Sequence, residues 1–103
     1  MTAIGELTVV PVRSGSMSDQ IAAAIEALDA FDVDYEVHAM GTVFESETAS
    51  ELFAAASAVH DAVDEERVIT TLRVDDKRTA RRTASEKVAS VERQLSSRGA
   101  VDE

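Results

Sequence analysis

The sequence predicts one α+β domain, in which a four-stranded antiparallel sheet carries two helices on one face and a further helix follows at the C-terminus. Three observations predict this fold. The 103 residues leave room for a single domain. Segments rich in β-branched residues alternate with segments whose apolar residues recur at helical spacing. The order of these segments is strand, helix, strand, strand, helix, strand, helix.

The first strand and helix are predicted from residues 2–31. Residues 2–12 (TAIGELTVVPV) are rich in β-branched residues, and Pro11 lies near their end, where a missing backbone donor is tolerated. Ser16 is placed to cap the helix that follows. The apolar residues of that helix, all at helical spacing, are Ile21, Ala24, Ile25, Leu28 and Phe31.

The middle of the chain predicts a hairpin and a second helix. Residues 35–40 alternate between apolar and polar side chains, which indicates a half-buried strand. Gly41 breaks this strand, and residues 42–46 (TVFES) return as the next one. A second helix follows, with its apolar side formed by Leu52, Ala56, Val59 and Val63.

The last strand and helix complete the pattern. Residues 67–75 (RVITTLRVD) are strongly β-branched, and a polar run over residues 76–83 leads to a helix with one apolar side. Two β-α units with right-handed crossovers place both crossover helices on the same face of the sheet. We therefore expect residues 1–103 to form a single ferredoxin-like domain. The apolar side of the last helix consists of Ala84, Val88, Val91 and Leu95.

Composition excludes several classes of site and partner. The chain has no cysteine, which excludes disulfides, thiolate metal sites and a cysteine nucleophile. It shows neither a basic leader followed by an apolar run nor the roughly 20 apolar residues of a membrane helix, so a soluble cytoplasmic protein is expected. A net charge of −10 repels nucleic-acid phosphates and anionic membranes. Nucleic acid and membrane are therefore not expected partners.

The acidic composition also predicts a response to salt. Eight of the ten basic residues are Arg and seventeen residues are Ala, which favours a halophilic protein over a surface that is acidic only for solubility. Because salt screens the repulsion among these charges, the melting temperature is expected to rise between low and molar salt. A thermal unfolding series across that range measures it. A flat series would contradict the halophilic interpretation.

Strand alternation divides the sheet into two faces. The face expected under the helices carries Leu7, Val9, Tyr35, Val37, Phe44, Leu72 and Val74. The other face, which we call the open face, is too apolar for a solvated surface and too polar for a core, so it is expected to meet another subunit or a ligand. Its members are Glu6, Thr8, Val10, Glu36, His38, Met40, Val43, Glu45, Ile69, Thr71 and Arg73.

Titratable residues give no pattern typical of an active site. His38 is interpreted as a partly exposed strand residue and His60 as a packed or capping one, because neither stands in a zinc-binding motif. No combination of nucleophile, base and orienting group is apparent, and we expect no enzymatic activity and no metal. An acid–base pair remains open, since Glu6, Glu36 and Glu45 share the open face.

Three segments resemble motifs of one family. Residues 35–45 (YEVHAMGTVFE) resemble the pattern Y-x-(V/L)-x-x-M-G-T-x-x-E. Residues 68–78 (VITTLRVDDKR) resemble a V-x-T-T-(I/L)-(K/R)-(I/V)-D-x-R strand and turn, and residues 86–91 (EKVASV) resemble the E-K-V-x-S-V start of a final helix. Together these motifs are similar to those of the small thiamine-binding protein family, and the likeness spans nearly the whole chain in the right order.

The resemblance implies a fold, an assembly and a ligand. Its members are ferredoxin-like, form homotetramers from paired sheets, and in some cases bind thiamine or its hydroxymethylpyrimidine moiety without known catalysis. We therefore expect thiamine as a ligand and no other cofactor. The alternative is an assembly or regulatory protein whose open face serves only subunit contacts. The positions that the resemblance implies for ligand contact are Met40, Gly41, Thr42, Glu45, Thr71 and Arg73.

Overall fold

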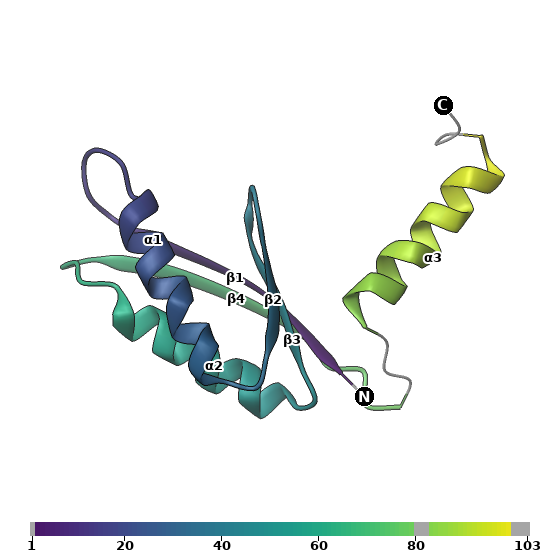
Figure 1. The fold of residues 1–103 in the computed structure, drawn as a ribbon, viewed down its shortest axis with the longest axis horizontal. Helices are drawn as coiled ribbons and strands as arrows, with labels where there is room; N and C mark the ends of the chain where they lie inside the picture. The colour runs from purple at the N-terminus through teal and green to yellow at the C-terminus, as the bar shows by residue number, and fades with distance from the viewer. Residues whose placement is uncertain (1, 80–82, 100–103) are drawn as a thin grey trace.

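The computed structural model describes residues 2–79 and 83–99 and confirms the predicted fold. The sheet has the strand order β2-β3-β1-β4, every neighbouring pair is antiparallel, and both crossover helices lie on one face (Figure 1). The elements are β1 (Ala3–Pro11), α1 (Ser18–Ile25), the short 3-10 helix η1 (Glu26–Ala30), β2 (Asp34–His38), β3 (Gly41–Ser46), α2 (Ala49–Ala62), β4 (Val68–Asp75) and α3 (Ala84–Ser97).

The hydrophobic core lies between the two crossover helices and the inner face of the sheet. Its largest fully buried side chains include Phe44 from β3, Leu7 from β1 and Leu52 from α2. Gly5 lies opposite Phe44 in the β1–β3 register. A Cβ on Gly5 would stand only 2.5 Å from Cε1 of the Phe44 ring, so this position needs glycine for the close approach of the ring.

The helix ends follow local hydrogen-bonding rules, with one difference from the prediction. α1 begins after Met17, while the Ser16 hydroxyl accepts a 3.4 Å hydrogen bond from the N–H of Ser18, so Ser16 acts one residue before the N-cap. Thr48 caps α2 in the usual way, because its hydroxyl accepts a 3.2 Å hydrogen bond from the N–H of Glu51.

The prediction that β2 is a half-buried strand is wrong, because all five of its residues are exposed. The register places Tyr35 and Val37 on the predicted side, but their exposed fractions are 39% and 64%. β2 is an edge strand, and the crossover helices pack mainly over the other three strands. The Tyr35 hydroxyl donates a 3.0 Å hydrogen bond to Asp29, which raises the pKa of the tyrosine.

α3 projects away from the sheet (Figure 1). Its start is fixed by a capping box, in which the Thr83 side chain accepts from the N–H of Glu86 and the Glu86 carboxylate accepts from the N–H of Thr83. The predicted apolar side of this helix is present, yet none of the α3 side chains is buried. Across residues 2–79 and 83–99, no helix is long and apolar enough to cross a membrane.

Candidate functional site

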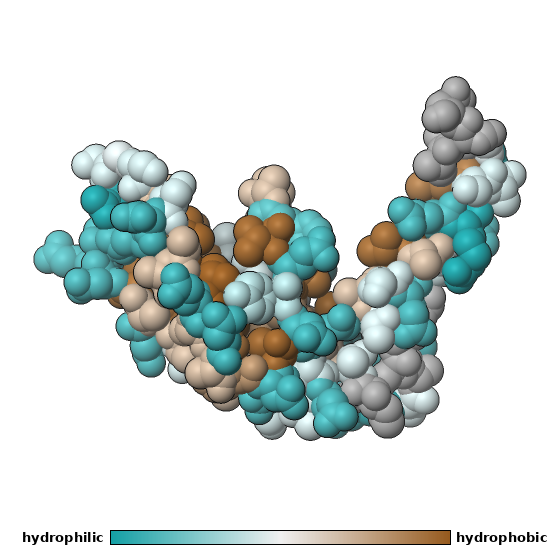
Figure 2. Space-filling view, viewed as in Figure 1, coloured by the Kyte–Doolittle hydropathy of each residue, from teal (hydrophilic) through white to brown (hydrophobic). Residues whose placement is uncertain are grey.

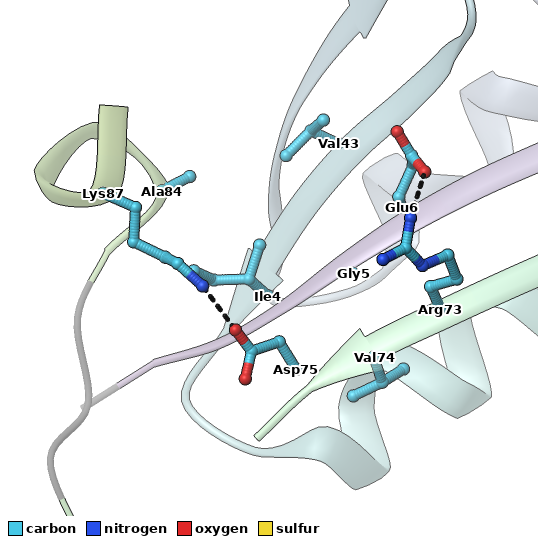
Figure 3. Close-up of a pocket in the computed structure, with 9 residues that line it drawn as sticks. All are labelled: Ile4, Gly5, Glu6, Val43, Arg73, Val74, Asp75, Ala84 and Lys87. Carbon is cyan, nitrogen blue, oxygen red and sulfur yellow. Dashed lines mark hydrogen bonds and ion pairs between the residues drawn. The ribbon is translucent and has the colours of Figure 1, made fainter. Parts of the chain in front are cut away.

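A cavity of about 330 Å³ opens on the open face, where the start of β1 and the end of β4 meet the first turn of α3 (Figure 3). Three strands and one helix contribute to its wall. The lining residues are Ile4, Gly5 and Glu6 from β1, Val43 from β3, Arg73, Val74 and Asp75 from β4, and Ala84 and Lys87 from α3.

Strand register places charged and apolar side chains side by side at this cavity. Ile4 of β1 lies between Glu45 of β3 and Asp75 of β4, because it pairs with both. Directly opposed residues in antiparallel strands project from the same face of the sheet. This row therefore carries one carboxylate on each side of an apolar side chain.

The next row on this face has a carboxylate at its centre, with an apolar side chain on one side and a basic one on the other. Glu6 of β1 lies between Val43 of β3 and Arg73 of β4. Nη1 of Arg73 is 3.8 Å from Oε1 of Glu6, and the arginine side chain is 82% exposed. Exposed pairs of this kind contribute about 0–1 kcal/mol, so the guanidinium can exchange this partner for another at little cost.

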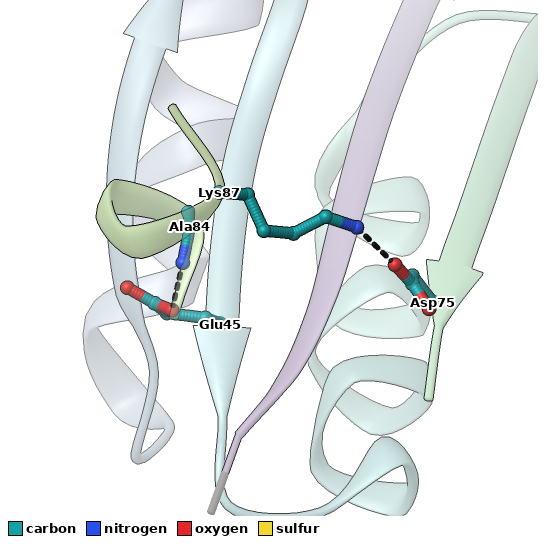
Figure 4. Close-up of polar contacts among 4 residues, drawn as sticks. All are labelled: Glu45, Asp75, Ala84 and Lys87. Atoms are coloured by element: carbon teal, nitrogen blue, oxygen red, sulfur yellow. Dashed lines mark hydrogen bonds and ion pairs between the residues drawn. The ribbon is translucent and has the colours of Figure 1, made fainter. Parts of the chain in front are cut away.

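Two contacts join the sheet to the first turn of α3 (Figure 4). Oε2 of Glu45 accepts a 3.1 Å hydrogen bond from the N–H of Ala84, a free donor at the helix N-terminus, where negative charge is favoured. Nζ of Lys87 lies 2.5 Å from Oδ2 of Asp75. The hydrogen bond and the charge of Lys87 lower the pKa of Asp75.

The pKa of Asp75 gives a direct test of this contact. In Lys87→Met, the pKa of Asp75 is expected to rise towards its ordinary value, because both the hydrogen bond and the nearest positive charge are removed. In the unmodified chain, the contribution of the pair to stability is present above the ordinary aspartate pKa and is lost as the pH falls through the lowered pKa.

Carboxylate NMR titration measures this shift. Lys77→Met is the matched control, because Lys77 acts on Asp75 only through its charge, as the weakest of the contributing causes. Its effect on the pKa of Asp75 is expected to be smaller. Equal effects of the two substitutions, or no change in Lys87→Met, would contradict the contact.

Comparison with known proteins places this chain in a family. The sequence model of the family described as thiamine-binding protein matches residues 5–92. The chain belongs to this family. The match runs from the third residue of β1 to the middle of α3, so it includes every lining residue of the cavity except Ile4.

Two relatives are similar to this chain in sequence over most of their length. A UPF0045 protein of Methanothermobacter thermautotrophicus is 45% identical over 95 residues, which cover 87% of this chain and 96% of the relative. A UPF0045 protein of Bacillus subtilis is 31% identical over 102 residues, which cover 90% of this chain and 97% of the relative. The likeness therefore extends over nearly the full length of both proteins.

Solved structures share the fold. A hypothetical protein of Methanocaldococcus jannaschii has a TM-score of 0.82 at 29% identity, covering 88% of this chain and 96% of its own. A Thermotoga maritima protein with a provisional assignment to thiamine biosynthesis or salvage has a TM-score of 0.75 at 23% identity, covering 88% and 99%. At that identity, the second likeness shows the fold alone.

Three of the six residues that the family resemblance implies for ligand contact lie on the open face, where the cavity also opens. Arg73 lines the cavity, and Glu45 lies beside it at the base of α3. Thr71 is two residues before Arg73 on the same strand and pairs with Thr8, which places both hydroxyls on the open face beyond the cavity. These residues could bind one ligand together, or a ligand and a neighbouring subunit.

The other three residues lie elsewhere on the hairpin. Met40 was predicted to continue the alternation of the strand, and this prediction is wrong. The residue lies in the turn after β2, with 83% of its surface exposed. At Gly41 the backbone passes so close to β1 that a Cβ would be 3.0 Å from the carbonyl oxygen of Leu7. Thr42 is 4% exposed and faces the helices, because it pairs with Leu7 on the covered side.

Several lining residues were not among the six implied by sequence. Ile4 and Asp75 could have been added, because they have the strand parity of Glu6 and Arg73. Ala84 and Lys87 could not, because their place over the sheet depends on contacts with Glu45 and Asp75, which are distant from them in the sequence.

The two histidines lie outside the cavity. Nδ1 of His60 is 2.6 Å from Oγ1 of Thr70, which joins the exposed side of α2 to β4. Nε2 of His38 is 3.4 Å from Oε1 of Glu36 at the exposed edge strand. Within the described part of the chain, no three side chains of the metal-ligating types converge.

Proposed function

We propose that this protein binds thiamine or its hydroxymethylpyrimidine moiety on the open face, without catalysis, as a cytoplasmic homo-oligomer. The observation that carries the proposal is the cavity at the base of α3, which combines carboxylates with apolar side chains in a member of the thiamine-binding family.

The cavity matches the chemistry of thiamine. The ligand carries a cationic thiazolium ring and an aminopyrimidine, so it needs negative charge, hydrogen-bond acceptors and an apolar wall. Glu6, Asp75 and the neighbouring Glu45 supply three carboxylates, while Ile4 and Val43 supply apolar surface. The volume of about 330 Å³ lies at the lower end of the range for small-molecule sites, roughly 300–1,000 Å³.

The lining residues favour the binding of a ligand over catalysis. Arg73 and Lys87 are donors, Glu6 and Asp75 are acceptors, and both pairs are already formed across the cavity wall. In the described residues of this wall, no hydroxyl or thiol nucleophile stands beside a base. A binding protein needs only the donors, the acceptors and the apolar wall.

The oligomer is proposed to be a homotetramer. Ile69 is 48% exposed on the open face and Met40 is 83% exposed in the turn after β2, which leaves apolar surface in contact with solvent in a single chain. Light scattering in molar salt is expected to give a mass of about four chains. A species of the chain mass, 11.0 kDa, would contradict assembly.

A purely structural role on the open face is the second candidate. It is favoured by the Arg73–Glu6 and Lys87–Asp75 pairs, which satisfy four charged side chains without any ligand. In that case the oligomer would close the cavity and leave no room for a small molecule. Ligand binding by the assembled protein separates the two candidates.

Calorimetric titration in molar salt tests the proposed ligand. Thiamine and hydroxymethylpyrimidine are both expected to bind, with thiamine the tighter because its cation meets the carboxylates of the cavity. Choline is the control for charge alone, and its binding should be much weaker. A folded sample that is silent with thiamine and with hydroxymethylpyrimidine would remove this function and leave the structural one.

A further inference from the structure

Four charged side chains in the wall of the cavity form two ion pairs (Figure 3). Arg73 is paired with Glu6 and Lys87 with Asp75, so the charges of the described lining residues sum to zero. A cationic ligand therefore meets no unpaired carboxylate among these lining residues. To form an ion pair with the wall, the ligand has to displace one of the two basic side chains.

The two ion pairs differ in strength. Nζ of Lys87 donates a 2.5 Å hydrogen bond to Oδ2 of Asp75, and this contact lowers the pKa of the carboxyl. Nη1 of Arg73 is 3.8 Å from Oε1 of Glu6, which is too far for a hydrogen bond. The Lys87–Asp75 contact also joins α3 to the sheet, so its loss would loosen the helix. The Arg73–Glu6 pair is therefore the one that a ligand opens at the lower cost.

Arg73 can leave Glu6 and stay hydrated. Its side chain is 82% exposed, so the guanidinium is already in contact with water. Figure 2 shows a hollow between the sheet and α3, and the first turn of α3, which contributes Ala84 and Lys87 to the cavity, lies at the base of this hollow. Because exposed ion pairs of this kind are weak, the release of the guanidinium into solvent costs little free energy.

The position of Glu6 suits the cation of a flat aromatic ligand. Glu6 lies at the centre of its row, directly opposite both Val43 and Arg73 on the neighbouring strands. When the guanidinium leaves, the carboxylate has an apolar side chain on one side and the former place of the guanidinium on the other. A ring cation such as thiazolium is planar and has a delocalised charge, as a guanidinium does, so it can take that place.

We propose that Arg73 is an internal competitor of the ligand, which pairs with Glu6 in the ligand-free protein and gives up this carboxylate to the cationic ring when the ligand binds. Asp75 stays paired with Lys87, and α3 keeps its place. The inference rests on the proposed function and assigns the cation of the ligand to one carboxylate. It also reverses the role that the family resemblance implies for Arg73, because a residue that contacts the ligand aids binding, whereas a competitor opposes it.

The sign of the change in affinity caused by Arg73→Gln separates these two roles. Calorimetric titration, at the lowest salt concentration that keeps the chain folded, is expected to show thiamine binding about three- to fivefold tighter in the variant. No ion pair then has to be opened, and a positive charge is removed from beside the cation. Arg67→Gln is the matched control, because it removes the same charge from an exposed residue just before β4, at the end of the strand away from the cavity. It should leave the affinity unchanged.

The gain in affinity should depend on charge. It is expected to be smaller for uncharged hydroxymethylpyrimidine than for thiamine, and to shrink as salt is raised, because salt screens the competition between the two cations. Equal or weaker thiamine binding by Arg73→Gln, or a gain that is constant across the salt range, would overturn the inference and leave the proposed function in place. A folded chain that binds neither ligand in any variant would overturn both.

A double-mutant cycle tests whether Glu6 is the carboxylate for which the two cations compete. Glu6→Gln should weaken thiamine binding, and in that background Arg73→Gln should no longer tighten it. A gain of the same size with and without Glu6 would overturn the assignment. In the unmodified protein, saturation with thiamine should shift the Nε–H resonance of Arg73 and leave that of Arg67 in place. An Arg73 resonance that does not move would show that the guanidinium is not displaced, and would overturn the inference as well.

Discussion

Replacement of Glu45 by Gln is expected to weaken thiamine binding by about 1.5–3 kcal/mol, the range for hydrogen bonds to charged groups. The substitution removes the charge and keeps the shape. The amide oxygen of Gln can still accept the hydrogen bond from the N–H of Ala84, so α3 should keep its place at the cavity. Calorimetry on the variant measures the loss of affinity, and light scattering on the same sample measures assembly.

The matched control is Glu66→Gln, which removes one carboxylate from an exposed loop residue remote from the cavity. Its affinity for thiamine should equal that of the unmodified protein. If Glu45→Gln instead loosens the oligomer before it affects the ligand, Glu45 belongs to a subunit contact. Unchanged affinity with intact assembly would show that Glu45 has neither role.

Replacement of Phe44 by Ala is expected to lower the free energy of unfolding by about 3–5 kcal/mol, because it leaves a cavity in a close-packed core. Phe44 is fully buried where β1, β3 and the crossover helices meet. Phe53 on α2 is the matched control, since its side chain is 56% exposed. Phe53→Ala should change stability by no more than about 0.5 kcal/mol, as is usual for surface positions. Chemical denaturation compares the two.

Gly5 provides a second test of the same packing. Gly5→Ala is expected to cost about 1–3 kcal/mol, because the added methyl group would meet the Phe44 ring. In a Phe44→Ala background the ring is gone, so the same change at Gly5 should cost little. Additive losses in the double variant would show that the two positions do not interact.

Much of the fold could be predicted from local patterns. The strands of the sheet and the two crossover helices follow from alternation and helical spacing, and the register puts Leu7 and Phe44 on the predicted inner face. The exposure of Tyr35 and Val37 could not be predicted, because alternation gives the side of the sheet and not the extent of the helices over an edge strand.

The six positions that the resemblance implies for ligand contact do not lie together in the fold. Glu45 and Arg73 lie at the cavity, but Thr42 faces the core. Motif spacing does not tell which side of a strand a motif residue occupies, so it groups residues from both faces. The contribution of Lys87 depends on a contact between segments twelve residues apart, which no periodicity encodes.

Amide chemical-shift mapping during a thiamine titration tests whether a thiamine-type ligand occupies the cavity at the base of α3. Saturable shifts are expected, with little change in α1 and on the helix-covered face, and they should be largest at Glu6, Val43, Arg73 and Ala84. A titration without shifts, or with shifts confined to the helix-covered face, would contradict it.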